Sequence, residues 1–354
     1  MATAMLQLRP TMRLLFAETP IDVGWSLRHG RWPTRAPLRP IGPTGRLWAQ
    51  TPRKWLPRKL WPRGDLSLCR QVVRAGHELG FDRPLLWIND STYAPLVEST
   101  GWPSVYDVTD DWLLATGVGR ELERQHRNDA ELLRRASEVV VCSPALAASR
   151  GQTRRVHLIT NGVEVDHLRG PTERPGDLPL GRIVMYQGTL SAGRLDLPLC
   201  AELCRGLADG AAVVFVGPNS LSSEDELELT DAGAIILGSR PYAVVPAYLQ
   251  HADLLIVPHQ VTPFTESLDP IKAREFIAVG RPVVATPVAG FRDLGPQVTV
   301  AGSQDFVGAV QAVLDGPPMP AGPGPLIDQP ETWIKQATEF LKVLDTASDD
   351  RADP

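Results

Sequence analysis

Apolar residues in this chain fall into short continuous runs that alternate with stretches of helical periodicity. Continuous β-branched runs are typical of strands buried on both faces, as in parallel sheets. In the first half, the runs predict strands at residues 13–17, 84–89, 104–109, 138–143 and 155–160, with helices at 66–79 and 119–136. In the second half they predict strands at 183–188, 212–217, 234–238, 253–258 and 282–287, with helices at 195–207, 242–251, 270–279, 305–314 and 331–344.

This alternation predicts an α/β fold made of two doubly wound units. The length of 354 residues agrees, because it exceeds what one ordinary core supports. A stretch rich in Pro, Gly and charge, "RGPTERPGDLPLG", separates the halves. We therefore expect an N-terminal domain at 1–169, a linker at 170–181, a second domain at 182–328, a C-terminal helix at 329–347 that packs back on the first domain, and a disordered tail at 348–354.

Composition narrows the class of protein. A hydrophobic content of 43% and a charged content of 22% fit a soluble globular chain, and no apolar run approaches the roughly 20 residues of a membrane span. The N-terminus lacks a signal-peptide pattern, and we interpret Cys69, Cys142, Cys200 and Cys204 as reduced thiols in a cytoplasmic protein. No Gly-x-Gly-x-x-Gly follows a strand and no Walker loop is present, which argues against a dehydrogenase or a P-loop NTPase. We expect no metal and no cofactor.

Charge is distributed unevenly. Residues 23–64 contain ten Lys or Arg, no Asp or Glu, and five of the nine tryptophans, although the whole chain has a net charge of −5. Cations near anionic lipid contribute about 1 kcal/mol each, and Trp favours the headgroup zone. The segment therefore predicts peripheral contact with the inner face of a membrane, with residues 53–64, "RKWLPRKLWPRG", in a loop or short helices as the best candidate. A solvated loop and a pocket for a soluble acceptor stay open; nucleic-acid binding ranks last, because no nucleic-acid fold accompanies the charges.

One helix start carries candidate chemistry. Asp269 can cap a helix in which Pro270 takes the first position, and Gly280 can end it. Lys272 and Glu275 are three residues apart, so they share a face. The free N–H groups of a first turn bind anions, Lys272 would add charge, and Glu275 could accept hydrogen bonds from a diol. This is the geometry of a bound nucleotide, but an exposed Lys–Glu pair of little consequence fits the spacing equally well.

Four stretches in order carry a family resemblance. They are "LITNGVEVDHL" at 158–168, "MYQGTLSAGRLD" at 185–196, "YAVVPAYLQHADLLIVP" at 242–258 and "DPIKAREFIAVGRPVVAT" at 269–286. Together they resemble the nucleotide-sugar-binding domain of GT-B glycosyltransferases, most closely family 4. The resemblance implies GT-B architecture: two Rossmann-like domains facing a cleft, with the donor on the second. It also implies transfer with retention and without metal, from a nucleotide-diphosphate sugar to a glycan, lipid-linked or small-molecule acceptor on the first.

The resemblance also implies roles for individual residues. Arg194 would neutralise the diphosphate, although a solvated surface arginine is the alternative. The family motif Glu-x7-Glu is altered here to an Asp-Pro-Ile-Lys variant, because Ser267 occupies the first glutamate position and Glu266 comes one residue too early. The implied donor-binding set is Gly188, Thr189, Arg194, Gly217, Tyr242, Ser267, Lys272 and Glu275.

Three carboxylates are catalytic candidates: Asp110, Asp111 and Glu266. The two aspartates belong to "YDVTDDW", which resembles a segment of related bacterial transferases. They come directly after a predicted strand, where α/β folds bind ligands, and could orient the acceptor. A helix cap with a structural turn explains them equally well. Two other functions stay open: a nucleotide-sugar 2-epimerase of the same fold, and a catalytically silent partner that binds nucleotide sugar.

Overall fold

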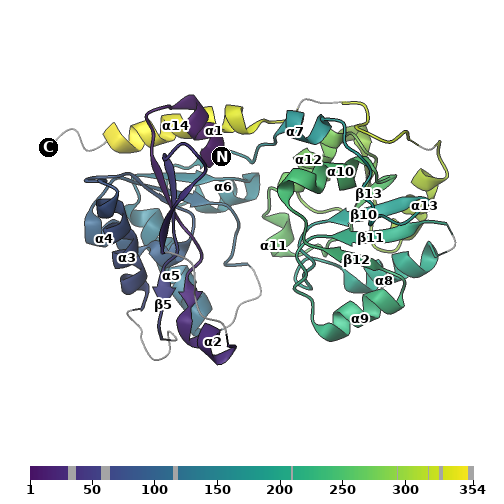
Figure 1. Cartoon of the computed structure of the whole chain (residues 1–354), viewed down its shortest axis with the longest axis horizontal. Helices are drawn as coiled ribbons and strands as arrows, with labels where there is room; N and C mark the ends of the chain where they lie inside the picture. The colour runs from purple at the N-terminus through teal and green to yellow at the C-terminus, as the bar shows by residue number, and fades with distance from the viewer. Residues whose placement is uncertain are drawn as a thin grey trace. The chain divides into compact units, whose positions relative to one another are not determined.

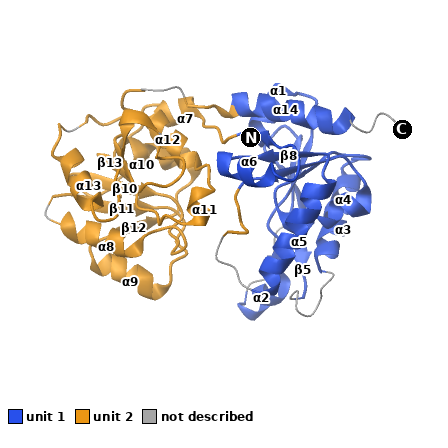
Figure 2. Ribbon diagram, turned by 180° about the vertical axis from the view of Figure 1, so that it is seen from behind, with its two compact units in different colours: residues 1–109, 117–159, 334–354 blue, residues 110–116, 160–333 orange. Residues whose placement is uncertain are grey.

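The computed structural model describes residues 1–30, 37–56, 64–114, 119–208, 210–292, 294–317, 319–326 and 330–349. The chain forms two compact units (Figures 1 and 2). Unit 1 comprises residues 1–109, 117–159 and 334–354, and unit 2 comprises residues 110–116 and 160–333. Among the described residues, no helix has both the length and the apolar character needed to span a bilayer.

Unit 2 is built on a six-stranded parallel sheet. Its strands are β10 (Ile183–Gln187), β11 (Ala212–Val216), β12 (Ile235–Gly238), β13 (Leu254–Val257), β14 (Val283–Ala285) and β15 (Val298–Val300). They lie in the order β12-β11-β10-β13-β14-β15, so the winding direction reverses between β10 and β13. The five predicted strands are confirmed, and β15 was missed. In doubly wound folds, ligands bind at the carboxyl ends of the strands beside such a reversal.

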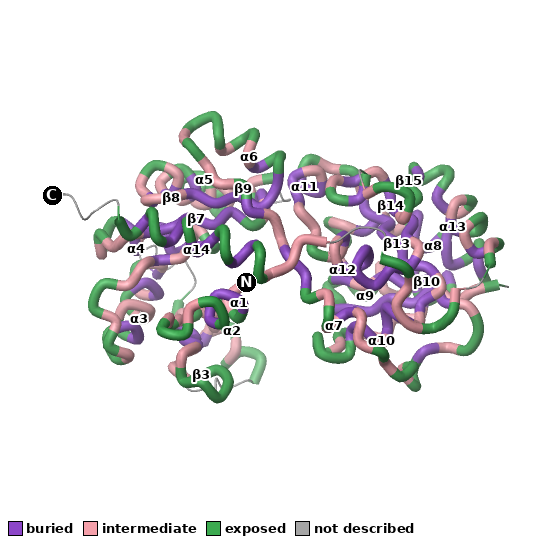
Figure 3. The backbone as a smooth tube through the Cα atoms, turned by 90° about the horizontal axis from the view of Figure 1, so that it is seen from above, coloured by how far each residue is buried: buried purple, intermediate pink, exposed green. Residues whose placement is uncertain are grey.

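Helices surround this sheet, and its strands are coloured as buried in Figure 3. Their buried side chains fall into two apolar clusters. Met185 packs in one cluster and the adjacent Tyr186 in the other, as the alternation of a strand requires. This two-sided burial explains why the strands read as continuous apolar runs. The helices of the unit are α7 (Val165–Arg169), α8 (Leu197–Gly206), α9 (Ser223–Asp231), η2 (Tyr242–Val244), α10 (Val245–Gln250), α11 (Pro263–Glu266), α12 (Ile271–Val279), η3 (Gly295–Gln297) and α13 (Phe306–Leu314).

Unit 1 contains a four-stranded parallel sheet in sequential order. Its strands are β6 (Leu86–Ile88), β7 (Ser104–Val108), β8 (Glu138–Val141) and β9 (His157–Leu158). Leu68, Leu132 and Leu146 fill the core beside it and are almost fully buried. These leucines belong to three of the helices around the sheet. The helices are α3 (Gly64–Glu78), η1 (Ser91–Tyr93), α4 (Pro95–Thr100), α5 (Arg120–Arg135) and α6 (Pro144–Arg150).

The basic segment contributes regular structure that the sequence analysis did not predict. The predicted first strand is β1 (Leu14–Ala17); it pairs with β4 (Leu47–Gln50), which pairs with β3 (Leu38–Ile41). A second small sheet joins β2 (Ile21–Asp22) to β5 (Arg53–Lys54), and α2 (Val23–Arg28) follows β2 directly. The expectation of a loop or helices from residue 53 is therefore wrong at Arg53 and Lys54. Residues 57–63 and 31–36 lie outside the described residues.

The two ends of the chain meet in unit 1. Helix α1 (Ala2–Leu8) and the C-terminal α14 (Trp333–Asp349) lie side by side (Figures 1 and 2). Arg9 donates to the carboxylate of Asp345 at 2.7 Å, and the Phe340 ring centroid lies 4.8 Å from that of Trp87. Helix α14 continues to Asp349, so residues 348 and 349 are helical although the sequence placed them in a disordered tail. Residues 350–354 lie outside the described residues.

Substitution of Gly217, which follows β11, tests the tight packing at the carboxyl ends of the unit 2 strands. A Cβ at this position would lie 1.9 Å from the carbonyl oxygen of Gly188. Overpacking of this kind destabilises a fold by about 1–3 kcal/mol. We expect Gly217→Ala to lower the thermal unfolding midpoint, measured by calorimetry. Gly302→Ala is the matched control, because a Cβ at Gly302 would meet nothing within 4 Å; equal midpoints for both variants would contradict the close approach.

Candidate functional site

The candidate site is built around Gly188, directly after β10 at the reversal of the sheet. A Cβ at Gly188 would lie 2.5 Å from Cε of Lys272 and 2.8 Å from the hydroxyl oxygen of Tyr186. The Gly188 carbonyl in turn presses against Cα of Gly217. No side chain fits between these groups. The backbone after β10 is therefore held directly against the lysine, which is an arrangement that lets a ligand approach main-chain atoms and a cation together.

Helix α12 delivers Lys272 and Glu275 to this place. It runs from Ile271 to Val279, so Pro270 lies just before the helix and not in its first position as predicted. Gly280 follows the helix, and its φ of 74° is the left-handed stop expected from the sequence. The prediction that Asp269 caps it is wrong. The Asp269 carboxylate instead accepts from the backbone N–H of Asn161 at 2.7 Å and pairs with Arg274 at 2.7 Å. Two segments of the family resemblance, 158–168 and 269–286, thus meet through Asn161 and Asp269.

Lys272 and Glu275 form a pair that is largely withdrawn from water. Glu275 is 7% exposed, so the alternative of an exposed pair of little consequence is wrong. Burial lowers the pKa of Lys272; the Glu275 charge opposes this shift and the Arg194 charge adds to it. Burial likewise raises the pKa of Glu275, against the attraction of Lys272 and His167. Each charge therefore stabilises the ionised form of the other in a place that disfavours both.

His259, which the sequence analysis missed, completes the inner part of the site. It comes just after β13, and its Nε2 lies 3.3 Å from the Tyr186 hydroxyl oxygen. Thr286 fixes the backbone, accepting from the His259 N–H at 3.1 Å and donating to its carbonyl at 2.7 Å. Burial, with the charges of Lys272 and Arg194, lowers the pKa of His259 to about 3. A neutral imidazole beside two cations avoids a third positive charge. The only signal for His259 in the sequence was its place in "VPH", directly after the predicted strand.

Arg194 lies among aromatic and acidic groups. Its guanidinium carbon is 5.5 Å from the centroid of Phe264, and the Phe264 ring is 5.7 Å from Trp112. Burial raises the pKa of Asp110, and the Arg194 charge opposes that shift. Asp110 and Trp112 therefore pack with unit 2, although the strand that precedes them belongs to unit 1. Asp111 is 5% exposed, so of the two aspartates Asp110 is the more accessible to a ligand.

Tyr242, at the start of η2, is the aromatic residue of the predicted donor-binding set. It is half exposed, and its ring centroid lies 4.6 Å from that of His167. Burial, with the charges of Glu164 and Glu275, raises the pKa of Tyr242 to about 12. Glu275 thus interacts electrostatically with Lys272 and also with His167 and Tyr242.

The structure shows contacts for Glu266, at the end of α11, and for Ser267, which follows it. The Glu266 carboxylate pairs with Arg292 at 2.6 Å and accepts from the Ala289 N–H at 3.1 Å. Ser267 is 4% exposed and its hydroxyl donates to the Phe264 carbonyl at 2.7 Å. The Thr189 carbonyl accepts from the Tyr186 hydroxyl at 3.2 Å. These contacts hold loops in place; the functional roles of the three residues stay predictions.

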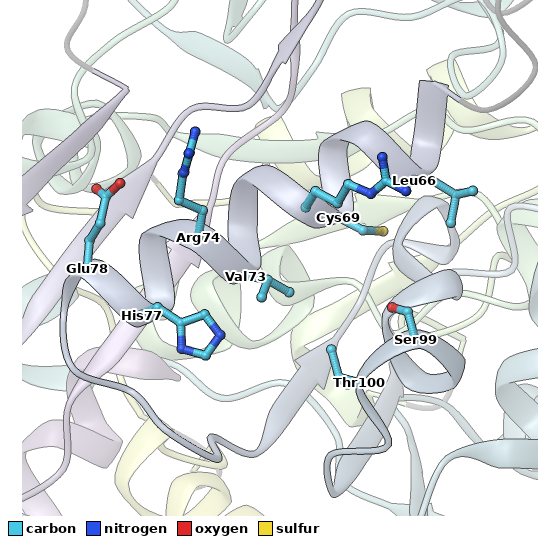
Figure 4. A pocket seen from close by; sticks show the side chains of 9 residues that line it. Leu66, Cys69, Val73, Arg74, His77, Glu78, Ser99 and Thr100 are labelled. Atoms are coloured by element: carbon cyan, nitrogen blue, oxygen red, sulfur yellow. The ribbon is translucent and has the colours of Figure 1, made fainter.

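A separate hollow of about 770 Å³ lies on unit 1, along α3 and the end of α4 (Figure 4). None of the predicted site residues lines it. Burial, with the Asp65 charge, raises the pKa of Cys69 in its wall to about 12, so this thiol is not an activated nucleophile. Its lining consists of Leu66, Cys69, Arg70, Val73, Arg74, His77, Glu78, Ser99 and Thr100. Across the described part of the chain, no group of three or more His, Cys, Asp or Glu residues is arranged to hold a metal ion.

Comparison with known proteins identifies the domain that carries the site. Residues 182–315 match the family model of glycosyl transferases group 1. This part of the chain is therefore similar to a group 1 glycosyltransferase domain. A relative in Bacillus subtilis, the putative teichuronic acid biosynthesis glycosyltransferase TuaH, is 27% identical over 227 residues, which cover 58% of this chain. The alignment spans 56% of that relative's own length.

Solved structures resemble the whole chain. Sucrose-phosphate synthase from Thermosynechococcus elongatus superimposes with a TM-score of 0.61 at 16% identity, covering 96% of this chain and 97% of its own. Anabaena HepE in complex with UDP and glucose gives 0.67 at 15% identity, covering 94% and 99%. The expected GT-B fold class is thereby confirmed, as is the resemblance to GT-B glycosyltransferases. The Asp-Pro-Ile-Lys variant and the predicted domain boundaries stay predictions.

The depressed pKa of His259 leads to a measurable pH dependence. In an unfolded chain the imidazole takes up a proton near its ordinary pKa of about 6.5, whereas burial in unit 2 lowers the pKa of His259 to about 3. This residue therefore stabilises the fold less as pH falls from about 6.5 towards 3. We expect its ring signals in NMR to show no titration between about pH 5 and pH 8. The signals absent from His259→Gln identify it, and a midpoint near 6.5 would contradict the burial argument.

Proposed function

We propose that this chain is a glycosyltransferase that takes a sugar from a nucleotide-diphosphate donor and passes it, with retention at the anomeric carbon and without a required metal, to an acceptor. The observation that carries the proposal is the meeting of Lys272, Arg194 and Glu275 around Gly188, at the reversal of the unit 2 sheet. Ligands of doubly wound folds bind at this position.

Each part of the site has a role in binding the donor. The diphosphate would lie against the Gly188 backbone between Lys272 and Arg194, since a departing diphosphate develops negative charge and needs fixed positive partners. Glu275 would accept from the ribose hydroxyls, and the half-exposed Tyr242, whose ring lies tilted against that of His167, would contact the base. The neutral His259 would offer a hydrogen bond to the sugar or phosphate without adding charge.

Asp110 is the carboxylate that we propose for orienting the acceptor. It lies within electrostatic range of Arg194 and beside the exposed Trp112, a residue suited to stacking on a sugar ring. Glu266 would instead position the loop at 286–290, because Arg292 and the Ala289 N–H already occupy its oxygens. The relative named for teichuronic acid biosynthesis supports a glycan or lipid-linked acceptor over a small metabolite.

Donor binding is predicted to depend on the α12 pair. A charge-assisted hydrogen bond is worth about 1.5–3 kcal/mol, so Lys272→Met should weaken UDP binding roughly ten- to hundredfold. Glu275→Gln should weaken it less, since the amide keeps one acceptor. Isothermal titration calorimetry with UDP measures both. Arg205→Ala is the control, because Arg205 is an exposed cation of the same unit at the end of α8. If Lys272→Met binds UDP as tightly as Arg205→Ala does, the donor assignment is wrong.

Turnover tests the proposed reaction itself. Thermal-shift screening of UDP-, GDP- and dTDP-sugars selects the donor, and mass spectrometry then follows its products with and without oligosaccharide acceptors. We expect release of the nucleoside diphosphate, with the sugar on the acceptor or slowly on water, and an unchanged anomeric configuration by NMR. Arg194→Ala should slow this more than Arg194→Lys, because charge is the main requirement and fork geometry the lesser one.

The alternatives give different products. A donor that changes configuration without changing mass would establish a 2-epimerase, and a donor that binds but stays intact under every condition would establish a silent binding partner. Either result overturns the proposed transfer. Near-wild-type rates in both Arg194 variants would remove Arg194 from the diphosphate site while leaving the reaction class in place.

A further inference from the structure

Unit 1 exposes an unusual group of apolar side chains, the docking patch, defined as Trp25, Leu27, Trp55 and Leu56. Their exposed fractions are 52%, 47%, 56% and 47%. Isolated exposed apolar residues are normal on protein surfaces, whereas contiguous ones mark interaction sites. The question is therefore whether these four side chains are neighbours, and what surface would cover them.

Backbone pairing brings the two halves of the docking patch together. Ile21 pairs with Arg53 and Asp22 with Lys54 in the β2–β5 sheet, so α2 and residues 55–56 both emerge from the same end of that sheet. A Cβ on Gly24 would lie 3.4 Å from the Trp55 carbonyl. Figure 1 shows α2 and β5 at the end of unit 1 that lies opposite α1 and α14.

The scaffold under the docking patch is fixed, so its exposure is not a consequence of loose packing. Asp22 accepts from the Trp25 N–H at 2.9 Å and pairs with Lys54 at 3.5 Å. Gln71 of α3 holds both backbone groups of Arg53, at 2.9 and 3.0 Å. Val23 is buried beneath at 1% exposure. The firm anchoring of α2 and β5 thus presents the aromatic and aliphatic groups outward.

The charge around the docking patch favours an anionic partner, although less strongly than composition indicated. The ten cations of residues 23–64 are not all unopposed, because Lys54 pairs with Asp22 and Arg39 pairs with Glu18 at 2.5 Å. Arg28 remains exposed beside Trp25. In sequence, residues 31–36 add two further cations and residues 57–63 add three, with no acidic residue in either stretch.

We propose that the docking patch binds reversibly to the headgroup region of an anionic phospholipid bilayer. Tryptophan favours this zone, leucines can enter the adjoining acyl boundary, and the flanking cations are attracted to anionic lipid. The attachment is peripheral in geometry, since the patch is a helix and a short strand end and not a spanning element. It concerns unit 1 only and does not depend on the donor chemistry of unit 2.

Co-sedimentation with vesicles tests the proposal. The full chain should pellet with phosphatidylglycerol–phosphatidylcholine vesicles at about 0.01 M salt and release at about 1 M, as the Debye length falls from about 30 to 3 Å. Pure phosphatidylcholine should retain much less. Replacing both aromatic groups, as Trp25→Ser with Trp55→Ser, should weaken the partition into anionic vesicles by about tenfold or more. Leu27→Ser with Leu56→Ser should act in the same direction.

The matched control is Leu180→Ser with Leu227→Ser. These two leucines of unit 2 are 93% and 59% exposed, so their loss removes as much surface apolarity from elsewhere. The control should pellet like the wild type, and circular dichroism should be the same for all variants. A wild-type protein that stays in the supernatant, or patch variants that pellet as the control does, overturn the proposal. So does sedimentation velocity without lipid, if it reveals a dimer that the Trp25 and Trp55 changes abolish, because the patch would then be a protein interface.

Discussion

The arrangement of the site depends on one steric constraint, the absence of side chains at Gly188 and Gly217. The carbonyl of the first presses on Cα of the second, and the side chain of Lys272 fills the space where a Cβ of Gly188 would be. Because backbone and lysine touch, Lys272 is shielded from water, and its pKa falls for that reason. The sheet supplies the position, since β10 is the strand beside which the winding reverses. A side chain at Gly188 would meet the Lys272 Cε and the Tyr186 hydroxyl, so the end of the lysine or the tyrosine would have to move away from the strand end.

The electrostatics of the site follow from that burial. Lys272 is balanced by Glu275, and the nearby imidazole of His259 stays uncharged between Lys272 and Arg194. Lys272 and Arg194 thus have Glu275 and Asp110 as acidic neighbours, and burial weakens the screening of these charges, which strengthens the attraction of the two cations for an anion. Glu275 also acts on His167 and Tyr242, so a single carboxylate links the cationic and aromatic parts. A nucleotide has the same sequence of parts: phosphate, hydroxyls and base.

The predicted departure from the family motif concerns a segment that the structure describes. Ser267, which the resemblance sets at a glutamate position of that motif, is buried and its hydroxyl donates to the Phe264 carbonyl. Glu266 is turned to Arg292 and to the Ala289 N–H. Phe264 in turn lies under the Arg194 guanidinium and beside Trp112. The altered loop thus holds an aromatic surface beside Arg194, while Glu275 keeps its place on α12.

The sequence by itself determined the features that depend on local burial. Continuous apolar runs revealed five strands of the unit 2 sheet and the four-stranded sheet of unit 1. The spacing of Lys272 and Glu275, with Gly280 as the stop, placed both groups on one face of α12. Only the tertiary structure decided which distant groups meet. Asp269 contacts Asn161 and Arg274 instead of capping α12, and the His259 ring lies within hydrogen-bonding distance of the Tyr186 hydroxyl. Lys54 forms an ion pair with Asp22, and Arg39 forms one with Glu18. The physical reason is that the periodicity of apolar residues shows which face of a helix or strand is buried. The partner of a polar group depends instead on how elements that are far apart in the sequence pack together, and no local pattern encodes that packing.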